Sequence, residues 1–218
     1  LFQYVTGSLK DVTFEVFALE DVKSADGESE DYYKKDELVA TITTDDTGIA
    51  KVSGLPLGKY YVKEKATVDG FVLDDEAREI DLTYRDQDTA EVTYSADWQN
   101  NRQKAEVEVV KKEKDSDRVL EGAVFALCAK DDITGADGKV IMKADTVIEE
   151  LATDKEGKLT FTADLPIGFA YYIKETSPAS GFATTDEIQE FTFEYEGAEK
   201  EKVSYAFTFE DESTVIEI

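Results

Sequence analysis

Three ionisable residues in the second half of the chain fall where the surrounding pattern predicts apolar side chains. Lys111 ends an alternating apolar stripe over residues 105–109, and Asp211 ends a similar stripe near the end of the chain. Glu175 lies four residues after Tyr171 in a predicted strand, so the two residues share its apolar face. Alternate residues of a strand share a face, so we expect all three side chains to point into one domain.

An amine and two carboxyl groups inside a protein can react with one another. Burial disfavours the charged forms, lowering the pKa of a lysine and raising that of a carboxylic acid. A neutral Lys111 amine can attack the side-chain carbonyl of Asp211, while Glu175 transfers protons and polarises that carbonyl. The product would be an amide cross-link, formed with loss of water. A buried salt bridge among the same residues needs no reaction but has a large desolvation cost. The residue types alone do not decide between these two hypotheses.

The chain contains an internal repeat, and the strand that carries Glu175 is one of the motifs that recur. Motifs recur at an almost constant offset, as seen for Phe14 and Phe125, for Leu55–Gly58 and Leu165–Gly168, for Tyr60–Glu64 and Tyr171–Glu175, and for Gly70–Phe71 and Gly181–Phe182. Two copies of one domain explain this offset. We therefore expect a first domain over residues 1–103, called repeat 1, and a second over residues 104–218, called repeat 2.

Repeat 1 carries only part of the reactive set. Glu64 occupies the place of Glu175, and Asn100 occupies the place of Asp211, so ammonia rather than water would leave in a reaction. The same offset places the matching lysine one residue before Leu1, and Lys10 lies beyond the Thr6-Gly7 turn. Three hypotheses stay open: the sequence is cut just after this lysine, another upstream residue supplies the amine, or repeat 1 has no cross-link.

Both copies have the sequence pattern of β-structure. In repeat 1, strands are expected over residues 12–18, 38–42, 49–52, 60–64, 78–82 and 90–100, separated by turn signals such as Asp46-Thr47-Gly48. Short strands with frequent turns are typical of a sandwich or a barrel. Residues 143–150 have a weak helical pattern and could form one or two turns of helix. The predicted fold class is all-β, with two tandem domains.

Composition excludes several classes of function. The 218 residues carry a formal net charge of −26, which opposes binding to nucleic acid and to anionic membranes. The absence of histidine removes the commonest general base and metal ligand, and Cys128 alone cannot form an intrachain disulfide. No apolar run is long enough for a membrane span. The acidic loop over Asp131–Asp137 lacks the spacing of a calcium-binding EF-hand loop and reads as a solvated hairpin tip.

The repeated motifs resemble a known family of bacterial surface domains. The resemblance rests on Lys111–Asp115, Leu120–Phe125, Thr153–Gly157, Leu165–Gly168 and Tyr171–Phe182 together with their counterparts in repeat 1. As a set they are similar to the Cna-B type (SpaA-like) repeats of Gram-positive adhesins and pilins. The resemblance implies transthyretin-like (prealbumin-like, Ig-like) β-sandwiches. It also implies an autocatalytic isopeptide bond between Lys111 and Asp211, with Glu175 as the catalyst.

The resemblance implies a structural role at the cell surface. We expect a stalk or spacer segment of an extracellular, cell-wall-anchored adhesin or pilus-like protein, without cofactor or metal and without enzymatic turnover beyond its own cross-linking. Its expected partners are neighbouring repeats of the same polypeptide and, through other domains, a host matrix or surface ligand. Thr214–Ile218 resembles the start of another first strand, which predicts a longer array. The alternative is a ligand-binding adhesin module of the same fold, which would need an exposed apolar patch or groove.

Overall fold

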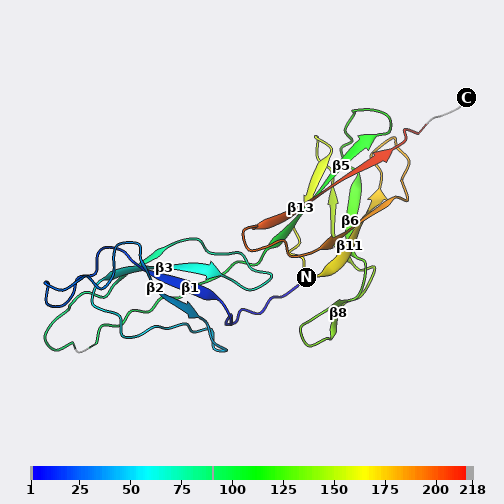
Figure 1. The fold of residues 1–218 in the computed structure, drawn as a ribbon. Coiled ribbons are helices and arrows are strands. Elements are labelled where there is room, and N and C mark those ends of the chain that lie inside the picture. The colour runs from blue at the N-terminus through cyan, green and yellow to red at the C-terminus, as the bar shows by residue number, and fades with distance from the viewer. Residues whose placement is uncertain (1, 90, 215–218) are drawn as a thin grey trace, which may run out of the picture. The chain divides into compact units, whose positions relative to one another are not determined.

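The chain divides into two compact units, each built mainly from one repeat (Figure 1). The computed structural model describes residues 2–89 and 91–214. Within these residues, one unit comprises 2–4, 103–196 and 202–214, and the other comprises 5–89, 91–102 and 197–201. All regular elements in the described residues are β-strands. Among the described residues, no helix has the length and hydropathy needed to cross a membrane.

The repeat 2 unit is a sandwich of two sheets. One sheet has the order β10-β5-β13, with strands β5 (Lys104–Glu113), β10 (Lys158–Phe161) and β13 (Lys202–Asp211). The other has the order β12-β11-β6-β9, with strands β6 (Val124–Ala129), β9 (Val147–Ala152), β11 (Phe169–Ser177) and β12 (Ile188–Phe193). A small hairpin, β7 (Ile133–Thr134) with β8 (Val140–Met142), lies in the connection between β6 and β9.

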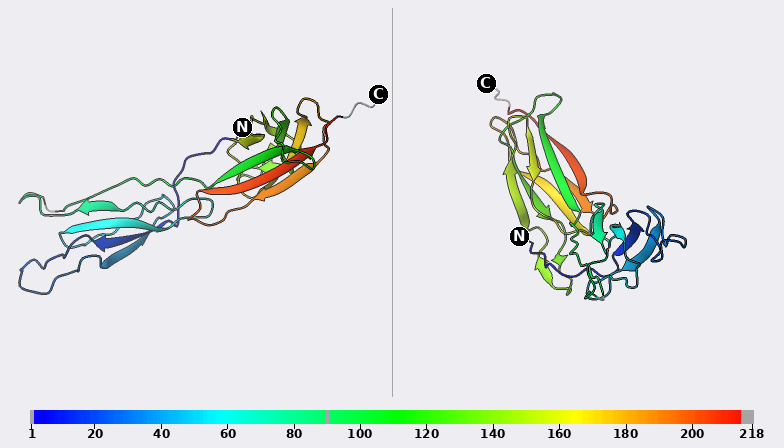
Figure 2. Two further views of the ribbon diagram at one scale, coloured as in Figure 1. Left: turned by 90° about the horizontal axis from the view of Figure 1, so that it is seen from above. Right: turned by 90° about the vertical axis from the view of Figure 1, so that its left-hand side faces the viewer.

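The first and last strands of repeat 2 pair in parallel along their whole length. Lys104 lies opposite Lys202 at one end of the ladder, and Glu113 lies opposite Asp211 at the other. Figure 2 shows β5 in green and β13 in red running side by side. Between the two sheets, alternate apolar side chains form the core, including Val107, Val109, Phe125, Leu127, Leu159, Tyr171, Ile173, Phe193, Val203 and Phe209.

The repeat 1 unit contains one paired sheet. Its order is β2-β1-β3-β4, with strands β1 (Thr13–Ala18), β2 (Leu38–Thr43), β3 (Lys59–Ala66) and β4 (Arg78–Asp81). These strands correspond one by one to β6, β9, β11 and β12 of repeat 2. Their core is smaller and consists of Val12, Phe14, Val16, Ala18, Val22, Tyr60 and Val62, with partly buried residues such as Trp98 packed against it.

Two strands predicted in repeat 1 do not form. The first was expected over residues 49–52 and the second over residues 90–100. The structure forms no strand over residues 49–52, and none over residues 91–100, the described part of the second. Their counterparts in repeat 2 are β10 and β13, and both of these pair with the central strand β5. At the offset between the repeats, only Lys112 and Glu113 of β5 have counterparts within the chain. In the described part of repeat 1, no central strand therefore supplies hydrogen bonds to the backbone of these segments.

The short helix predicted over residues 143–150 is also wrong. Asp145 has a φ of 63°, in the left-handed region that interrupts a right-handed helix. The chain turns there and enters β9 at Val147, where Ile148 is buried against the core. The weak helical pattern thus came from the alternation of a half-buried strand next to a turn.

Candidate cross-link site

Lys111, Glu175 and Asp211 meet inside repeat 2. The side chains of all three are fully buried. Lys111 Nζ lies 2.5 Å from Asp211 Oδ1, to which it donates a hydrogen bond, and 3.1 Å from Glu175 Oε1. The sequence predicted each of these residues to face inward, and the structure brings them together.

Strand pairing explains how residues so far apart in sequence come into contact. In the parallel ladder, Lys111 lies opposite Phe209, and Asp211 is the next residue of β13 on the same face. Glu175 comes from β11 in the opposite sheet, where it pairs with Phe125 of β6. The site therefore spans the interior between the two sheets, with an amine and one carboxyl group from one sheet and the second carboxyl group from the other.

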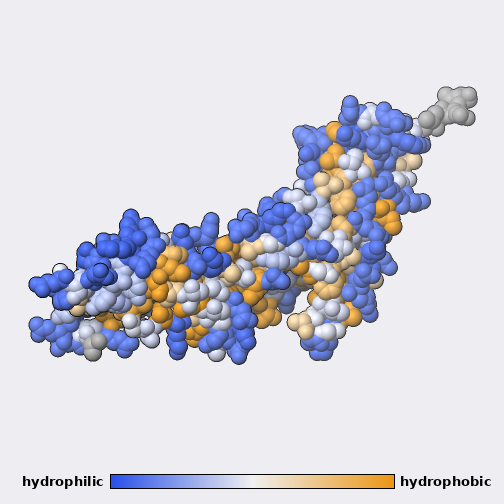
Figure 3. Space-filling model, viewed as in Figure 1, coloured by the Kyte–Doolittle hydropathy of each residue, from blue (hydrophilic) through white to orange (hydrophobic). Residues whose placement is uncertain are grey.

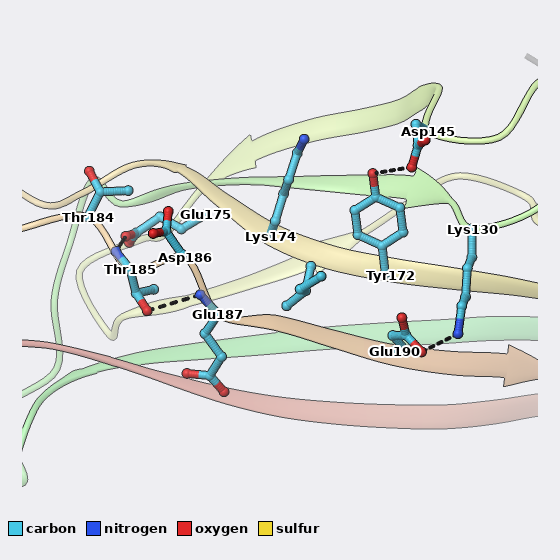
Figure 4. A pocket seen from close by; sticks show the side chains of 11 residues that line it. Lys130, Asp145, Tyr172, Lys174, Glu175, Thr184, Thr185, Asp186, Glu187 and Glu190 are labelled. Carbon is cyan, nitrogen blue, oxygen red and sulfur yellow. Dashed lines mark hydrogen bonds and ion pairs between the residues drawn. The ribbon is translucent and has the colours of Figure 1, made fainter.

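Glu175 is held by its own strand and by the loop that follows it. The backbone N–H of Thr185 donates to Oε2 over 3.1 Å, as Figure 4 shows. Burial raises the pKa of Glu175 above its ordinary value, and the contacts with Thr185 and Lys111 oppose this shift only partly. A raised pKa favours the protonated acid, which can donate a proton to a carbonyl oxygen.

Aromatic rings exclude water from the site. The ring centre of Phe125 lies 5.5 Å from Lys111 Nζ, and Phe125 packs against Phe209 with their centres 4.9 Å apart. Neither ring is exposed. Asp211 Oδ2 has no hydrogen-bond partner among the described residues, although it is buried. Such an atom carries an uncompensated desolvation cost.

The backbone at Lys111 is fixed by a tight turn. Lys111 N–H donates to Gly157 O over 2.8 Å, and Leu120 N–H donates to Lys111 O over 2.9 Å. Gly157 has a φ of 68°, and a Cβ added there would lie 2.8 Å from Lys111 O and 2.7 Å from Val119 Cβ. Only glycine fits this approach without moving the β5 backbone.

We expect Gly157→Ala to destabilise repeat 2 by about 1–3 kcal/mol, because it combines a strained φ with a backbone clash. Gly138→Ala is the matched control, since Gly138 has a φ of 77° but open space around it. Thermal or urea unfolding measures both variants. Equal losses in the two variants would show that the contact with Lys111 contributes nothing.

Repeat 1 contains the corresponding pair without a lysine. Asn100 Nδ2 donates to both carboxylate oxygens of Glu64, over 2.7 and 2.9 Å, and to Val72 O over 3.0 Å. Asp74 N–H donates to Glu64 Oε2 over 3.0 Å, as Thr185 does to Glu175. Within the described residues, no lysine forms an ion pair with Glu64. Lys10 instead pairs with Asp46 at the surface, 2.6 Å away.

Cys128 lies on β6, on the face of the β12-β11-β6-β9 sheet that points away from the main core. It is buried with Ala126 and Tyr172 in a small second cluster, outside the main core. Burial raises the pKa of its thiol, which leaves little thiolate at neutral pH. We expect a thiol reagent to label Cys128 at least tenfold more slowly in the native chain than in urea. Equal labelling rates would contradict the burial shown here.

Two acidic residues in and beside the β7–β8 hairpin form ion pairs with nearby lysines. Asp132 pairs with Lys143 at 2.8 Å, and Asp137 pairs with Lys139 at 2.8 Å. No cluster of potential metal ligands is found in the described part of the chain. The side chains of Asp132 and Asp137 are thus neutralised by lysines of the same segment.

A family profile covers most of the chain in two matches. The prealbumin-like fold domain of the SpaA family matches residues 4–98 and again residues 105–207. The chain belongs to this family. Two SpaA prealbumin-like domains in tandem confirm the predicted family resemblance and fold class. No curated protein sequence matches the chain significantly.

Solved structures similar to this chain come from several bacteria. The Bacillus anthracis TIE protein aligns with 95% of this chain at 26% identity and a TM-score of 0.56, and the chain spans 31% of its length. The shaft pilin SpaA of Lactobacillus rhamnosus GG aligns with 96% of the chain and 90% of the pilin, at 18% identity and a TM-score of 0.39. GBS52, a minor pilin of Streptococcus agalactiae, aligns with 100% of the chain and 89% of the pilin, at 19% identity and a TM-score of 0.35.

Two features of the candidate cross-link site were not predicted from the sequence. The loop N–H of Thr185 holds Glu175, and the turn at Gly157 holds the Lys111 backbone. The recurrence of Gly48 at the place of Gly157 is the one sequence signal that marks such a turn in both repeats. The Thr185 contact is made by a backbone group, so no side-chain motif can indicate it.

A hollow of about 460 Å³ lies on the surface near the same loop (Figure 4). Its lining mixes both charges, with Lys130 paired to Glu190 and Tyr172 donating to Asp145 over 3.1 Å. Glu175 also contributes to the lining, but its side chain is fully buried. The hollow therefore lies on the outer side of the loop and strand that cover the candidate cross-link site.

Proposed function

We propose that repeat 2 forms an isopeptide bond between Lys111 and Asp211, with Glu175 as the catalyst. The observation that carries this proposal is the 2.5 Å contact between an amine and a carboxyl group inside a pocket closed to water. The reaction is intramolecular and occurs once per chain, so this domain has no enzymatic turnover. Holding both groups in contact replaces a bimolecular encounter and thereby lowers the barrier.

The proposed reaction joins the Lys111 amine to the Asp211 carboxyl group and releases one water molecule. Within the ion pair, one proton passes from Lys111 Nζ to the Asp211 carboxylate. The neutral Nζ then attacks Cγ of the Asp211 carboxylic acid, while protonated Glu175 donates a hydrogen bond to the developing oxyanion. Glu175 then accepts a proton from Nζ and delivers one to the departing oxygen. The C–O bond breaks, one water molecule leaves, and an amide joins the two side chains. Glu175 is again protonated at the end of the reaction, as expected of a catalyst.

The unreacted salt bridge is the competing state. It keeps an amine and two carboxyl groups away from water, and Asp211 Oδ2 has no partner among the described residues. The desolvation cost of such a cluster exceeds the gain from its charges in many proteins. Amide formation removes one carboxyl oxygen and neutralises the amine, so it relieves both costs.

Intact-mass measurement tests the bond directly. We expect the purified chain to weigh one water molecule less than its sequence, with the deficit located in a branched peptide that joins β5 to β13. Lys111→Ala should restore the full mass. Lys174→Ala is the matched control, because Lys174 lies next to Glu175 but on the opposite face of β11, and it should keep the deficit.

Two other masses would overturn the assignment. A full unreacted mass for the wild-type chain refutes the cross-link in repeat 2. A deficit of one ammonia shows that an asparagine has reacted in place of Asp211.

We further propose that the chain is a structural segment of a pilus or surface adhesin, such as a stalk or spacer. The family match supports a role as a pilus or adhesin shaft component. The bond would join the first strand to the last, so tension between the ends of the repeat would pass through it. Figure 3 shows hydrophilic residues over most of the visible surface, as expected for a chain with a net charge of −26. We propose a cell-wall-anchored, extracellular location and assign any host ligand to other domains.

A further inference from the structure

We infer that the loop over residues 179–187, called the positioning loop, holds the two carboxyl groups of the proposed cross-link at a fixed separation. It binds Glu175 at one place and the chain next to Asp211 at another. Its Ala183 carbonyl faces the oxygen of Asp211 that leaves in the reaction. The inference rests on the proposed function, because it concerns the same reaction, and it gives a role to the repeated Gly-Phe motif.

The positioning loop begins with a tight turn that favours glycine. Phe182 N–H donates to Ala179 O over 3.1 Å, and Gly181 has a φ of 88°. A positive φ at the third residue is typical of a type II turn, where glycine is the preferred residue. Phe182 is partly buried and packs against the core of repeat 2. The Gly-Phe pair therefore fixes the start of the loop.

Backbone hydrogen bonds tie the positioning loop to the residues that follow Asp211. Ala183 N–H donates over 3.2 Å to the carbonyl of Glu212, the residue next to Asp211. A second bond runs from Thr214 N–H to the Gly181 carbonyl over 2.9 Å. The end of β13 that carries the reacting carboxyl group is therefore fixed to the loop.

The same loop holds the catalytic carboxyl group. Thr185 N–H donates to Glu175 Oε2, and Thr185 Oγ1 in turn accepts a hydrogen bond from Glu187 N–H over 3.2 Å (Figure 4). One short segment thus bonds to Glu175 and to the neighbour of Asp211. A fixed separation between reacting groups lowers the barrier of an intramolecular step.

Repeat 1 builds the same loop from different side chains. Gly70 has a φ of 91°, and Val72 N–H donates to Asn101 O over 2.8 Å. Asp74 N–H donates to Glu64 Oε2 over 3.0 Å. Each of these residues lies at the repeat offset from its counterpart in repeat 2. Because several of the side chains differ, the two copies share the backbone geometry of the loop.

Repeat 1 also indicates what the loop carbonyl does. There, Asn100 Nδ2 donates to Val72 O over 3.0 Å. Asp211 and Ala183 occupy these places in repeat 2, where Asp211 Oδ2 is buried and has no hydrogen-bond partner among the described residues. An ionised oxygen cannot bond to a carbonyl, whereas a protonated one donates to it. The Ala183 carbonyl thus selects Oδ2 as the protonated oxygen of Asp211.

This selection decides which bond of Asp211 breaks. With the hydrogen on Oδ2, neutral Lys111 Nζ attacks Cγ, and Oδ1 becomes the oxygen of the amide. The Cγ–Oδ2 bond breaks, and Oδ2 leaves as water with its own hydrogen and a second one that Glu175 transfers from Nζ. The loop carbonyl therefore holds the leaving group until the bond breaks.

Gly181→Ala tests the positioning loop, with Gly168→Ala as the matched control. Both glycines lie in turns of repeat 2, with φ values of 88° and 87°, and both have open space where a Cβ would be added. On a Lys111→Ala background, which cannot cross-link, the two substitutions should lower the melting temperature equally. Without that background, Gly181→Ala should slow the loss of water by about tenfold or more, and Gly168→Ala should stay within about twofold of the wild type.

Timed cell-free synthesis of the full chain, quenched in acid and followed by intact mass, measures these rates. Gly181→Asn should recover most of the rate, because asparagine is the next-best residue at this place in a type II turn. Thr185→Pro removes the N–H that holds Glu175 and should also slow the reaction. Thr185→Val keeps this N–H and is its control.

The two proposals fail in different ways. If Gly181→Ala loses water as fast as Gly168→Ala, or Thr185→Pro as fast as Thr185→Val, the loop does not position the reacting groups. The water deficit of the wild-type chain then leaves the proposed function standing. A wild-type chain that never loses water refutes the proposed function and this inference with it.

Discussion

Repeat 2 of the wild-type chain is expected not to lengthen when the chain is pulled by its ends. Tension would run along β5 to Lys111, across the amide to Asp211 and out of the domain. Residues 112–210 would lie outside this path and stay unstretched, whatever happens to their folding. Lys111→Ala should add an extension on the order of 300 Å, since an extended chain spans roughly 3.3–3.6 Å per residue.

Single-molecule force measurement separates these outcomes, because repeat 1 serves as an internal reference. Repeat 1 has no lysine at its site within the described residues, so it should extend in both proteins. Lys174→Ala should behave as the wild type. If the wild-type chain shows the same extra extension as Lys111→Ala, β5 and β13 are not covalently joined.

Glu175→Ala is expected to lower the melting temperature of repeat 2 by roughly 15–40 °C. The proposed bond would close a loop of about 100 residues, and a cross-link of that span stabilises a fold by about 4–5 kcal/mol in the chain-entropy description. For a domain of this size, each kcal/mol shifts the melting temperature by roughly 4–8 °C. Without Glu175, Lys111 and Asp211 stay unlinked, and the loss should appear in calorimetry of the purified chain.

Asp211→Asn separates loss of the bond from loss of a buried side chain. Asparagine keeps the shape of the site and still offers a carbonyl carbon to Lys111, with ammonia as the leaving group. We expect this variant to reach the same final mass as the wild type and to melt within a few degrees of it. If Glu175→Ala melts at the wild-type temperature while lacking the water deficit, the bond does not stabilise the domain.

The strand alternation in the sequence was enough to place the side chains of the candidate cross-link site. Side chains two residues apart share a face, and this local rule put Lys111, Glu175 and Asp211 inside repeat 2. The recurrence of motifs at an almost constant offset identified the two domains and located Glu64 and Asn100. Both inferences depend on short stretches of chain, where backbone geometry leaves few choices.

Pairing between distant strands was decided only in the tertiary structure. The parallel register of β5 with β13 brings Asp211 next to Lys111, and a slip of one residue would turn one of them outward. Strand pairing matters equally in repeat 1, where residues 49–52 and 91–100 have strand-like sequences but no central partner strand among the described residues. A strand needs hydrogen bonds from a neighbour, and the alternation of its own residues cannot provide them.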